Sequence, residues 1–429
     1  MSQDKSSREE MVSRFRNLLR RDDIAIQGVT MVVFSVISGV FMYLYQLAMG
    51  ILLEPEAYGT LFSLTSLFYI VTISAQAVST TVARFVSKLR AEDELENLGY
   101  LRRFFLKRAL VIGLVTFALF TLGSSFIARF LNIDKPLYVV TLFSAMLFIF
   151  LFYANQGTFA GLQRFLPLGI SLASESFFLM LVGASLVYLG LGIYGGLIAF
   201  PVSYMIALLV SFFWMRSLPG GESKELKIRG IGVYAGYVLL SVLGFNALTN
   251  LDAVLAKHYL TATQAGSYAA IAVLGRIALY APVGVATAMF PQTATLFERG
   301  GNHSRVFMRA LLLTSLISGA VVFGYVLFAR LIVGILYNGK YPGVSGYLST
   351  YALATMLFGL AHVAMRYLLS INQTKVAYLV LGALAFQLLL IRLFHATIGE
   401  LVGDMLVTGV TTFGFLFLFS LAAGRKSIR

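Results

Sequence analysis

The chain is a succession of long apolar stretches separated by short polar breaks. A helix of about 20 residues crosses a hydrocarbon core of about 30 Å. We therefore predict twelve membrane spans, at residues 25–52, 60–86, 106–127, 137–162, 168–189, 193–215, 233–257, 266–296, 307–329, 347–371, 376–394 and 401–423. Only 12% of the residues are charged, against about 25% in soluble domains, so the sequence excludes a soluble globular fold.

The polar segments predict the domain organisation. We expect a cytoplasmic amphipathic tail at 1–23, an N-terminal six-helix lobe at 24–215, a cytoplasmic linker at 216–230, a C-terminal six-helix lobe at 231–423 and a cytoplasmic tail at 424–429. Apolar residues of the first tail recur at helical spacing between arginines, which is typical of a helix on a membrane surface. A disordered basic tail is the alternative.

The distribution of Lys and Arg predicts the orientation of the spans. With the N-terminus inside, 25 basic residues fall in inner segments and six in outer ones. Basic residues concentrate in cytoplasmic loops, so we expect a multi-pass protein of the cytoplasmic (plasma) membrane with both termini in the cytoplasm. The same bias explains the net charge of +14 without a nucleic-acid partner.

The two halves of the chain resemble each other. Residues 53–59 precede the second span and residues 260–266 precede the eighth, at an offset of 207. Six spans per half is an even number, so both halves insert in the same direction and form a parallel repeat, with a substrate site between them. The predicted fold class is an all-α polytopic membrane protein with twelve transmembrane helices in two six-helix lobes related by a parallel pseudo-two-fold repeat.

Several short motifs occur in a characteristic order. They are Glu54-Pro55-Glu56-Ala57-Tyr58-Gly59, Ala83-Arg84, Gly161-Leu162-Gln163-Arg164-Phe165, Thr249-Asn250-Leu251-Asp252 and Ala265-Gly266-Ser267-Tyr268-Ala269. Together they resemble the motifs of the polysaccharide-export (O-antigen type) flippases, which belong to the multidrug/oligosaccharidyl-lipid/polysaccharide exporter superfamily. The resemblance covers essentially the whole chain.

This resemblance implies a function. It implies two six-helix lobes around a central cavity and translocation of a polyprenyl-diphosphate-linked oligosaccharide across the cytoplasmic membrane by alternating access, for cell-surface polysaccharide or glycan biosynthesis. The expected partners are that lipid-linked oligosaccharide, the lipid bilayer and a coupling proton or Na⁺, with other polysaccharide-assembly membrane proteins as candidates.

Arg276 is the most informative charge within a span. It lies ten residues after Gly266, about 15 Å along the helix and near the membrane midplane, and its sequence neighbours offer no counter-charge. A guanidinium facing a cavity binds phosphate oxygens bidentately, so we expect a diphosphate ligand whose replacement by Ala abolishes transport without unfolding. The alternative is an inter-lobe ion pair with Asp252 or Glu175.

Arg84 and Arg366 lie near the predicted inner ends of spans two and ten. Each is a candidate diphosphate ligand at the cytoplasmic mouth. The alternative for each is a basic anchor whose side chain reaches the membrane interface.

Asp252 and Glu175 are candidate ion-coupling residues, because a carboxyl within a span can bind a proton or Na⁺. A hydrogen-bonded or ion-paired structural role is the alternative for both. His362 has two interpretations as well: a titrating group, or a histidine packed between helices.

Polar uncharged side chains recur in spans one and four. Tyr45, Gln46, Asn155 and Gln156 combine rings and amides, which suit sugar faces and hydroxyl groups. The alternative is contact between neighbouring helices.

The sequence also predicts absences. Without cysteine there is no disulfide, thiol catalysis or thiolate metal site, and we find no phosphate-binding loop for ATP and no metal-ligand spacing. We expect a non-enzyme without cofactor or metal. Two other functions stay open: a multidrug or organic-cation antiporter of the same superfamily, which would need acidic cavity residues, and a membrane glycan polymerase or transferase, which usually has larger polar loops than this chain.

Overall fold

The computed structural model describes residues 30–31, 33–92, 94–216 and 233–426, and the predicted tail at 1–23 and most of the linker at 216–230 lie outside them. In the described part, twelve helices are long and apolar enough to cross a membrane. The predicted fold class and the count of twelve spans are therefore confirmed, and the chain is a multi-pass membrane protein.

The helices follow one another with short connections. In chain order they are the first span (Val33–Leu52), α2 (Pro55–Ala91), α3 (Leu98–Leu122), α4 (Ser124–Phe130), α5 (Leu137–Phe143), α6 (Met146–Gly161), α7 (Phe165–Leu186), α8 (Ile193–Met215), α9 (Val233–Leu248), α10 (Leu251–Tyr259), α11 (Ala262–Gly275), α12 (Ile277–Tyr280), α13 (Val283–Glu298), α14 (His303–Tyr337), α15 (Val344–Ser370), α16 (Val376–Leu393) and α17 (Ile398–Lys426). A 3-10 turn, η1 (Leu95–Asn97), precedes α3, and a π turn, η2 (Val187–Leu191), follows α7.

Some helices are longer than the apolar stretches that predict them. Helix α3 begins at Leu98 rather than at 106, and α14 ends at Tyr337 rather than at 329. Hydropathy detects the part of a helix that lies in hydrocarbon, whereas the backbone hydrogen bonds continue into the polar flanks.

The shortest predicted break, at 190–192, is a tight reversal between α7 and α8. Gly190 has φ +91° and Gly192 has φ +52°. This left-handed region carries little penalty for glycine and a steric one for other residues, so the two glycines let the chain turn between two antiparallel spans without a longer loop.

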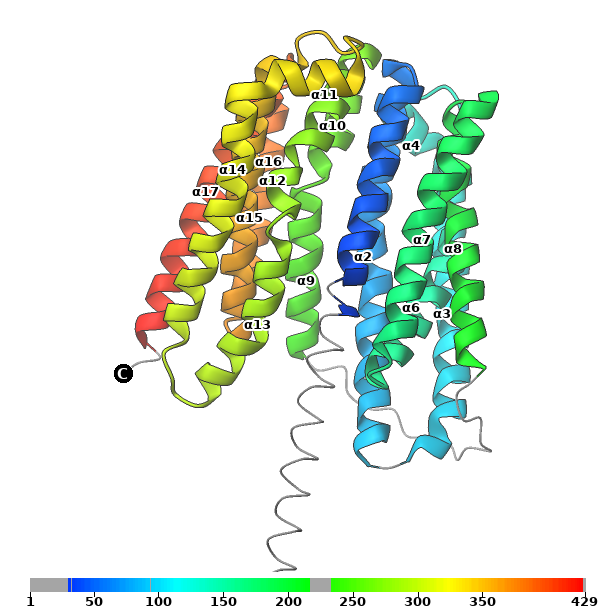
Figure 1. Cartoon of the computed structure of the whole chain (residues 1–429), viewed down its shortest axis with the longest axis vertical. Helices are drawn as coiled ribbons and strands as arrows, with labels where there is room; N and C mark the ends of the chain where they lie inside the picture. Colours follow the sequence, from blue (N-terminus) through cyan, green and yellow to red (C-terminus); the bar gives the residue numbers. More distant parts are fainter. Residues whose placement is uncertain (1–29, 32, 93, 217–232, 427–429) are drawn as a thin grey trace, which may run out of the picture.

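Two bundles lie side by side (Figure 1). In the first half of the chain, α7 packs on α8 and α2 on α6. In the second half, α15 packs on α14 and α17, and α16 on α9. Contact between the bundles runs chiefly through α2, which packs against α11, α10 and α9.

The bundles meet tightly at one end, which we call the closed end; it lies in the upper part of Figure 1. Thr263 donates to Glu56, 3.1 Å away, so two residues separated by the repeat offset of 207 touch across the interface. A Cβ on Gly266 would overlap the carbonyl oxygen of Pro55, and one on Gly59 would lie 2.6 Å from the Gly266 nitrogen. The paired glycines thus permit backbone-to-backbone packing.

The α14–α15 connection adds polar contacts to the closed end. The Lys340 ammonium donates to the carbonyl oxygens of Ile51 and Leu53, and the Tyr341 hydroxyl donates to that of Gly50, 2.8 Å away. Gly50 and Ile51 belong to the last turn of the first span and Leu53 directly follows it; the end of a helix leaves acceptors unpaired and attracts a cation.

The opposite end, the open end, has a different surface. One face of α2 carries residues that follow each other at intervals of seven or four. They are Phe62, Tyr69, Gln76, Thr80 and Arg84. Phe62 lies against Arg276 of the other lobe, which makes this the inter-lobe face of α2. Along it, Phe62 is buried, whereas Gln76, Thr80 and Arg84 are exposed. The lobes therefore cover this face near the closed end and leave it uncovered near the open end.

Candidate functional site

Arg276 lies where a buried helix is interrupted. Helix α11 ends at Gly275, Arg276 occupies its C-cap, and α12 starts at Ile277. Every position from Ala265 to Gly275 is buried, and Pro282 precedes α13. The break sets the Arg276 side chain, which is 8% exposed, against α10 and α15.

A polar network surrounds this guanidinium. Nη2 lies 2.8 Å from Oδ1 of Asp252, Nη1 donates to Asn250 at 3.2 Å, and Nε donates to the Tyr351 hydroxyl at 3.3 Å. The Asp252 carboxylate also accepts hydrogen bonds from the hydroxyls of Tyr268, at 2.9 Å, and Tyr351, at 2.7 Å. All five side chains belong to the second half of the chain.

This network agrees with one part of the alternative for Arg276 and corrects another. Arg276 has a counter-charge, Asp252, which was one of the two partners that the alternative named, and α10 rather than the sequence neighbours of Arg276 supplies it. The ion pair with Asp252 joins helices of one lobe, so it is not an inter-lobe pair. A fully buried pair with each oxygen of the carboxylate engaged is a rigid structural unit.

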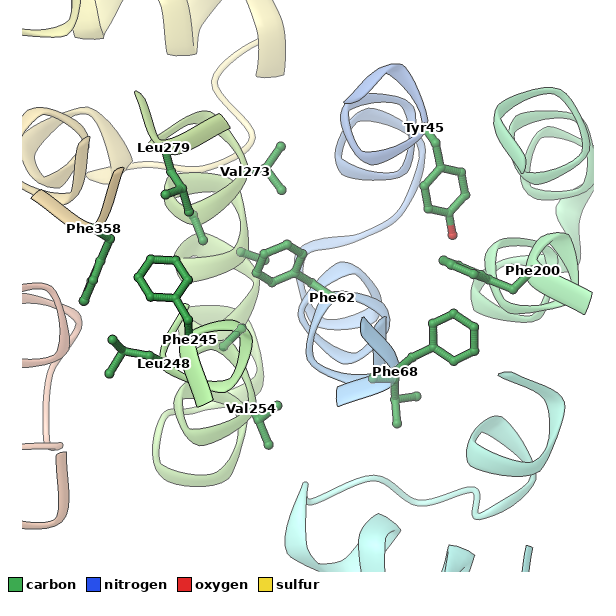
Figure 2. Close-up of a cluster of buried hydrophobic side chains, with 14 of the residues drawn as sticks. Tyr45, Phe62, Phe68, Phe200, Phe245, Leu248, Val254, Val273, Leu279 and Phe358 are labelled. Carbon is green, nitrogen blue, oxygen red and sulfur yellow. The ribbon is translucent and has the colours of Figure 1, made fainter. Parts of the chain in front are cut away.

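An apolar layer separates this network from the open end. In Figure 2, Phe62 projects from α2 toward α11 and α12, and Phe245 lies beside Leu279 and Phe358. The Arg276 guanidinium carbon lies 5.1 Å from the Phe62 ring centroid. On the other side of α2, Phe68 and Tyr45 each pack against Phe200 within the first lobe. Of these rings, Phe62 is therefore the one through which α2 contacts the other lobe.

Arg366 lies on the open-end side of this layer. Phe358, His362 and Arg366 follow each other at four-residue intervals on one face of α15. His362 packs against Phe245, with ring centroids 5.1 Å apart, and accepts a hydrogen bond from Nε of Arg366 at 3.3 Å. In the described residues, no carboxylate forms an ion pair with Arg366. Arg84 is likewise without one, and is exposed on the inter-lobe face.

Glu175 is buried inside the first lobe, on α7. It is 5% exposed and accepts a hydrogen bond from the Ser176 hydroxyl at 2.9 Å. Three tyrosines, Tyr69, Tyr153 and Tyr204, interact with it electrostatically. The ion pairs of the described residues do not include Glu175, so hydroxyl groups rather than a cation surround this carboxyl.

The four candidate glycan contacts separate into two pairs. Tyr45 donates to the carbonyl oxygen of Gly196 at 2.9 Å, and Asn155 donates to the Ser211 hydroxyl at 2.8 Å. These two join helices within the lobe. Gln46 Oε1 and both amide atoms of Gln156 are buried and lack a hydrogen-bond partner among the described residues.

A third buried carboxyl, Asp404 on α17, was not among the site residues predicted from the sequence. Asp404, Thr408 and Thr412 share a helix face, and Gln387 reaches this helix by donating to Met405. One oxygen of each of the four side chains is buried without a partner in the part of the chain that the structure describes. An acidic residue within an apolar stretch, the signal that identified Glu175, would have found it.

The described residues contain no group of three or more His, Asp or Glu side chains that could hold a metal ion. The polar clusters are thus of three kinds: an ion-paired network at Arg276, carboxyls without a basic partner, and cations without an acidic one.

Residues 48–345 match the model of a family described as "Polysaccharide biosynthesis protein". No curated protein matches the chain.

Solved structures show the same fold. A multidrug resistance MATE family transporter of the MOP superfamily superposes in its inward-facing conformation with a TM-score of 0.74, at 14% identity over 92% of this chain and 99% of that one. An outward-facing conformation of such a transporter gives 0.67, at 16% identity over 93% and 96%. A MOP superfamily transporter from Pyrococcus furiosus, whose binding pocket is described as reversed in polarity, gives 0.64, at 17% identity over 92% and 95%.

Proposed function

Because the chain belongs to the polysaccharide biosynthesis protein family, we propose that it is a flippase that translocates a polyprenyl-diphosphate-linked oligosaccharide across the cytoplasmic membrane by alternating access. One observation carries this proposal. On the open-end side, the span arginines Arg84 and Arg366 have no carboxylate partner among the described residues. A cation within a span pairs with a counter-ion or faces a water-filled cavity, and a diphosphate that enters such a cavity would supply the counter-ion.

The surface between these arginines and the closed end suits a glycan. Gln76 and Thr80 are exposed on the inter-lobe face of α2, and Thr287 and Gln292 are exposed on α13. Hydroxyl and amide groups exchange hydrogen bonds with sugar hydroxyls. By contrast, the exposed face of α14 carries Leu312, Leu316 and Phe323, which suits lipid.

The mechanism follows from this arrangement. The headgroup enters at the open end, which the sequence orientation assigns to the cytoplasm, and the diphosphate binds Arg84 and Arg366. The polyprenyl chain stays in lipid. Rocking of the lobes then separates Glu56 from Thr263 and closes the inter-lobe face of α2 at the opposite end. The chain has no role in bond cleavage in this scheme, so we propose a transporter rather than an enzyme.

An ion gradient can drive the cycle through a buried carboxyl. Asp252 is held by Arg276 and two tyrosines, which favours the structural alternative for that residue. Glu175 lies among hydroxyl groups that suit a proton or Na⁺. We therefore propose Glu175 rather than Asp252 as the coupling residue.

The alternative function is a multidrug or organic-cation antiporter. The observation that favours it is the presence of two buried carboxyls, Glu175 and Asp404, one in each lobe, that have no basic partner among the residues that the structure describes. A carboxylate attracts an organic cation, as the flippase arginines attract an anion.

The test is reconstitution of the full chain in vesicles with a polyprenyl-diphosphate disaccharide that carries a fluorophore on the sugar. We expect the protein to move labelled headgroups across the membrane, where an impermeant quencher reports them. Arg366→Ala should abolish this movement, and Arg392→Ala, an exposed arginine on α16, should not. No movement of the lipid, together with uptake of a cationic dye that depends on Glu175, would replace the proposal with the antiporter.

A further inference from the structure

His362 and Arg366 form a pair in which the histidine is the acceptor. Nε of Arg366 donates to Nε2 of His362 at 3.3 Å. An imidazole nitrogen that accepts a hydrogen bond carries no proton of its own, so the assigned state is the neutral ring with its proton on Nδ1. Phe245 of α9 packs on the same ring, at 31° to it.

This contact leaves one edge of the guanidinium unused. Arginine has five N–H donors in a fixed planar fork, and the hydrogen bond to His362 uses only Nε. In the described residues, Nη1 and Nη2 have neither a hydrogen-bond acceptor nor an ion pair. These two nitrogens form the edge that binds two oxygens of one phosphate.

Fixing Nε matters because a free arginine has many rotamers. Ordering such a side chain on binding costs conformational entropy, and an acceptor already in place removes part of that cost. The Phe245 contact fixes the His362 ring, which in turn fixes the plane of the guanidinium.

We propose that His362 is a positioning residue for the diphosphate: it holds Nε of Arg366 and thereby presents Nη1 and Nη2 to a phosphate group. This inference rests on the proposed function, since it assigns the orientation of a ligand residue of that function. It requires no charge on the histidine, and its effect passes through Arg366.

The test uses two substitutions that separate the hydrogen bond from the ring contact. His362→Gln keeps a hydrogen-bond acceptor and loses the ring, and His362→Phe keeps a ring against Phe245 and loses the acceptor. The probe is farnesyl diphosphate, with farnesol as the uncharged control, and the readouts are its Kd and the thermal unfolding of the full chain. Fluorescence of Trp214, the single tryptophan, reports the unfolding.

We expect His362→Phe to weaken binding about tenfold and His362→Gln by less than about threefold, at similar stability, since the lost hydrogen bond is to a charged group. Arg366→Lys should also weaken binding, because an ammonium cannot bind bidentately. On an Arg366→Ala background, His362→Phe should have no further effect on Kd.

Two results would overturn the inference while sparing the proposed function: His362→Phe binds like the wild type while Arg366→Ala does not, or His362→Gln loses as much affinity as His362→Phe. If Arg366→Ala itself binds farnesyl diphosphate and moves lipid like the wild type, the assignment of the diphosphate ligand fails, and the inference fails with it.

Discussion

Arg276 and Arg366 lie in the same lobe on opposite sides of the Phe62–Phe245 layer, and their surroundings are opposite in kind. Arg276 is 6% exposed and engages Asp252, Asn250 and Tyr351. Arg366 has one neutral partner, His362, within the described residues. A charge whose hydrogen bonds are filled by the protein stabilises the fold, whereas a charge left with free donors is available to a ligand.

The same contrast holds for the two ends of the molecule. At the closed end, the side chains of Glu56, Thr263 and Lys340 contact groups of the opposite lobe. Near the open end, Gln76, Thr80 and Arg84 are exposed on the inter-lobe face of α2. We therefore expect substitutions near the closed end to change stability and conformation, and those near the open end to change binding.

The largest expected effect is on stability, at Arg276. Arg276→Ala leaves the buried Asp252 carboxylate without its cation, which costs about 3–5 kcal/mol. Arg366→Ala removes a charge without a carboxylate partner and should change the free energy of unfolding by less than about 0.5 kcal/mol. Unfolding of the purified chain, followed by Trp214 fluorescence, measures both.

A charge-removing pair sharpens this test. The double variant Arg276→Met, Asp252→Leu should lose less stability than the sum of the losses of the two single variants. Each single variant leaves one buried charge without its partner, whereas the double variant removes both charges. Equal losses for Arg276→Ala and Arg366→Ala would contradict the distinction between the two arginines.

The next effect is on the closed end itself. Gly266→Ala places a methyl group against the Pro55 carbonyl, and overpacking of this kind costs about 1–3 kcal/mol. We expect the ends of α2 and α11 to separate. Since the chain has no native cysteine, Glu56→Cys with Thr263→Cys gives a clean cross-linking pair, and the yield of a short bifunctional maleimide should fall in the Gly266→Ala variant.

Gly284→Ala is the matched control for that substitution. Gly284 follows in the same predicted span, and a Cβ there meets no atom within 4 Å. An unchanged cross-linking yield in Gly266→Ala would show that the closed end tolerates the methyl group and that the paired glycines do not set the approach of the lobes.

A smaller effect is expected at the open end. Arg84→Ala should lower the rate of lipid movement about threefold to tenfold at unchanged stability, because an exposed cation acts through attraction that water and salt weaken. The difference between Arg84→Ala and the wild type should shrink as salt is raised. A loss that is independent of salt would point to a direct structural role instead.

Much of the fold follows from the sequence, because hydrophobic length fixes spans and the offset of 207 fixes the repeat. The register of the repeat even predicts which residues face each other, since Glu56 and Thr263 are equivalent positions that touch. Two equivalent segments near a pseudo-two-fold axis necessarily lie close together, so this contact was within reach of sequence reasoning.

The partner of Arg276 followed from the sequence only as an alternative, Asp252 or Glu175, and the sequence could not choose between them. The Arg276–Asp252 pair depends on how α10 and α11 are rotated about their axes and on the helix break at Gly275, neither of which hydropathy records. The same limit applies to the candidate glycan contacts. Gln46 Oε1 and both amide atoms of Gln156 lack partners in the described chain, whereas Tyr45 and Asn155 bond to neighbouring helices. The residue types predicted that these spans carry polar side chains. Which of those side chains bond to a neighbouring helix depends on how each helix is rotated about its axis, and the sequence does not show that rotation.

The smallest expected effect is at Lys340, and it tests whether the two ends are coupled. Lys340→Met removes the cation that contacts the carbonyls of Ile51 and Leu53, at a cost of about 1 kcal/mol to the closed end. That free energy changes the ratio of closed to separated lobes about fivefold. In the proposed alternating-access cycle the open-end site binds ligand only when the closed end is shut, so its apparent affinity should scale with that population. We therefore expect Lys340→Met to weaken farnesyl diphosphate binding by at most about fivefold and to lower the cross-linking yield of the Glu56→Cys, Thr263→Cys pair in parallel.

The control is Lys375→Met, which removes a basic residue at the start of α16, on the opposite end. A loss of affinity without a change in cross-linking would place Lys340 in direct contact with the ligand and end the separation of a structural closed end from a binding open end.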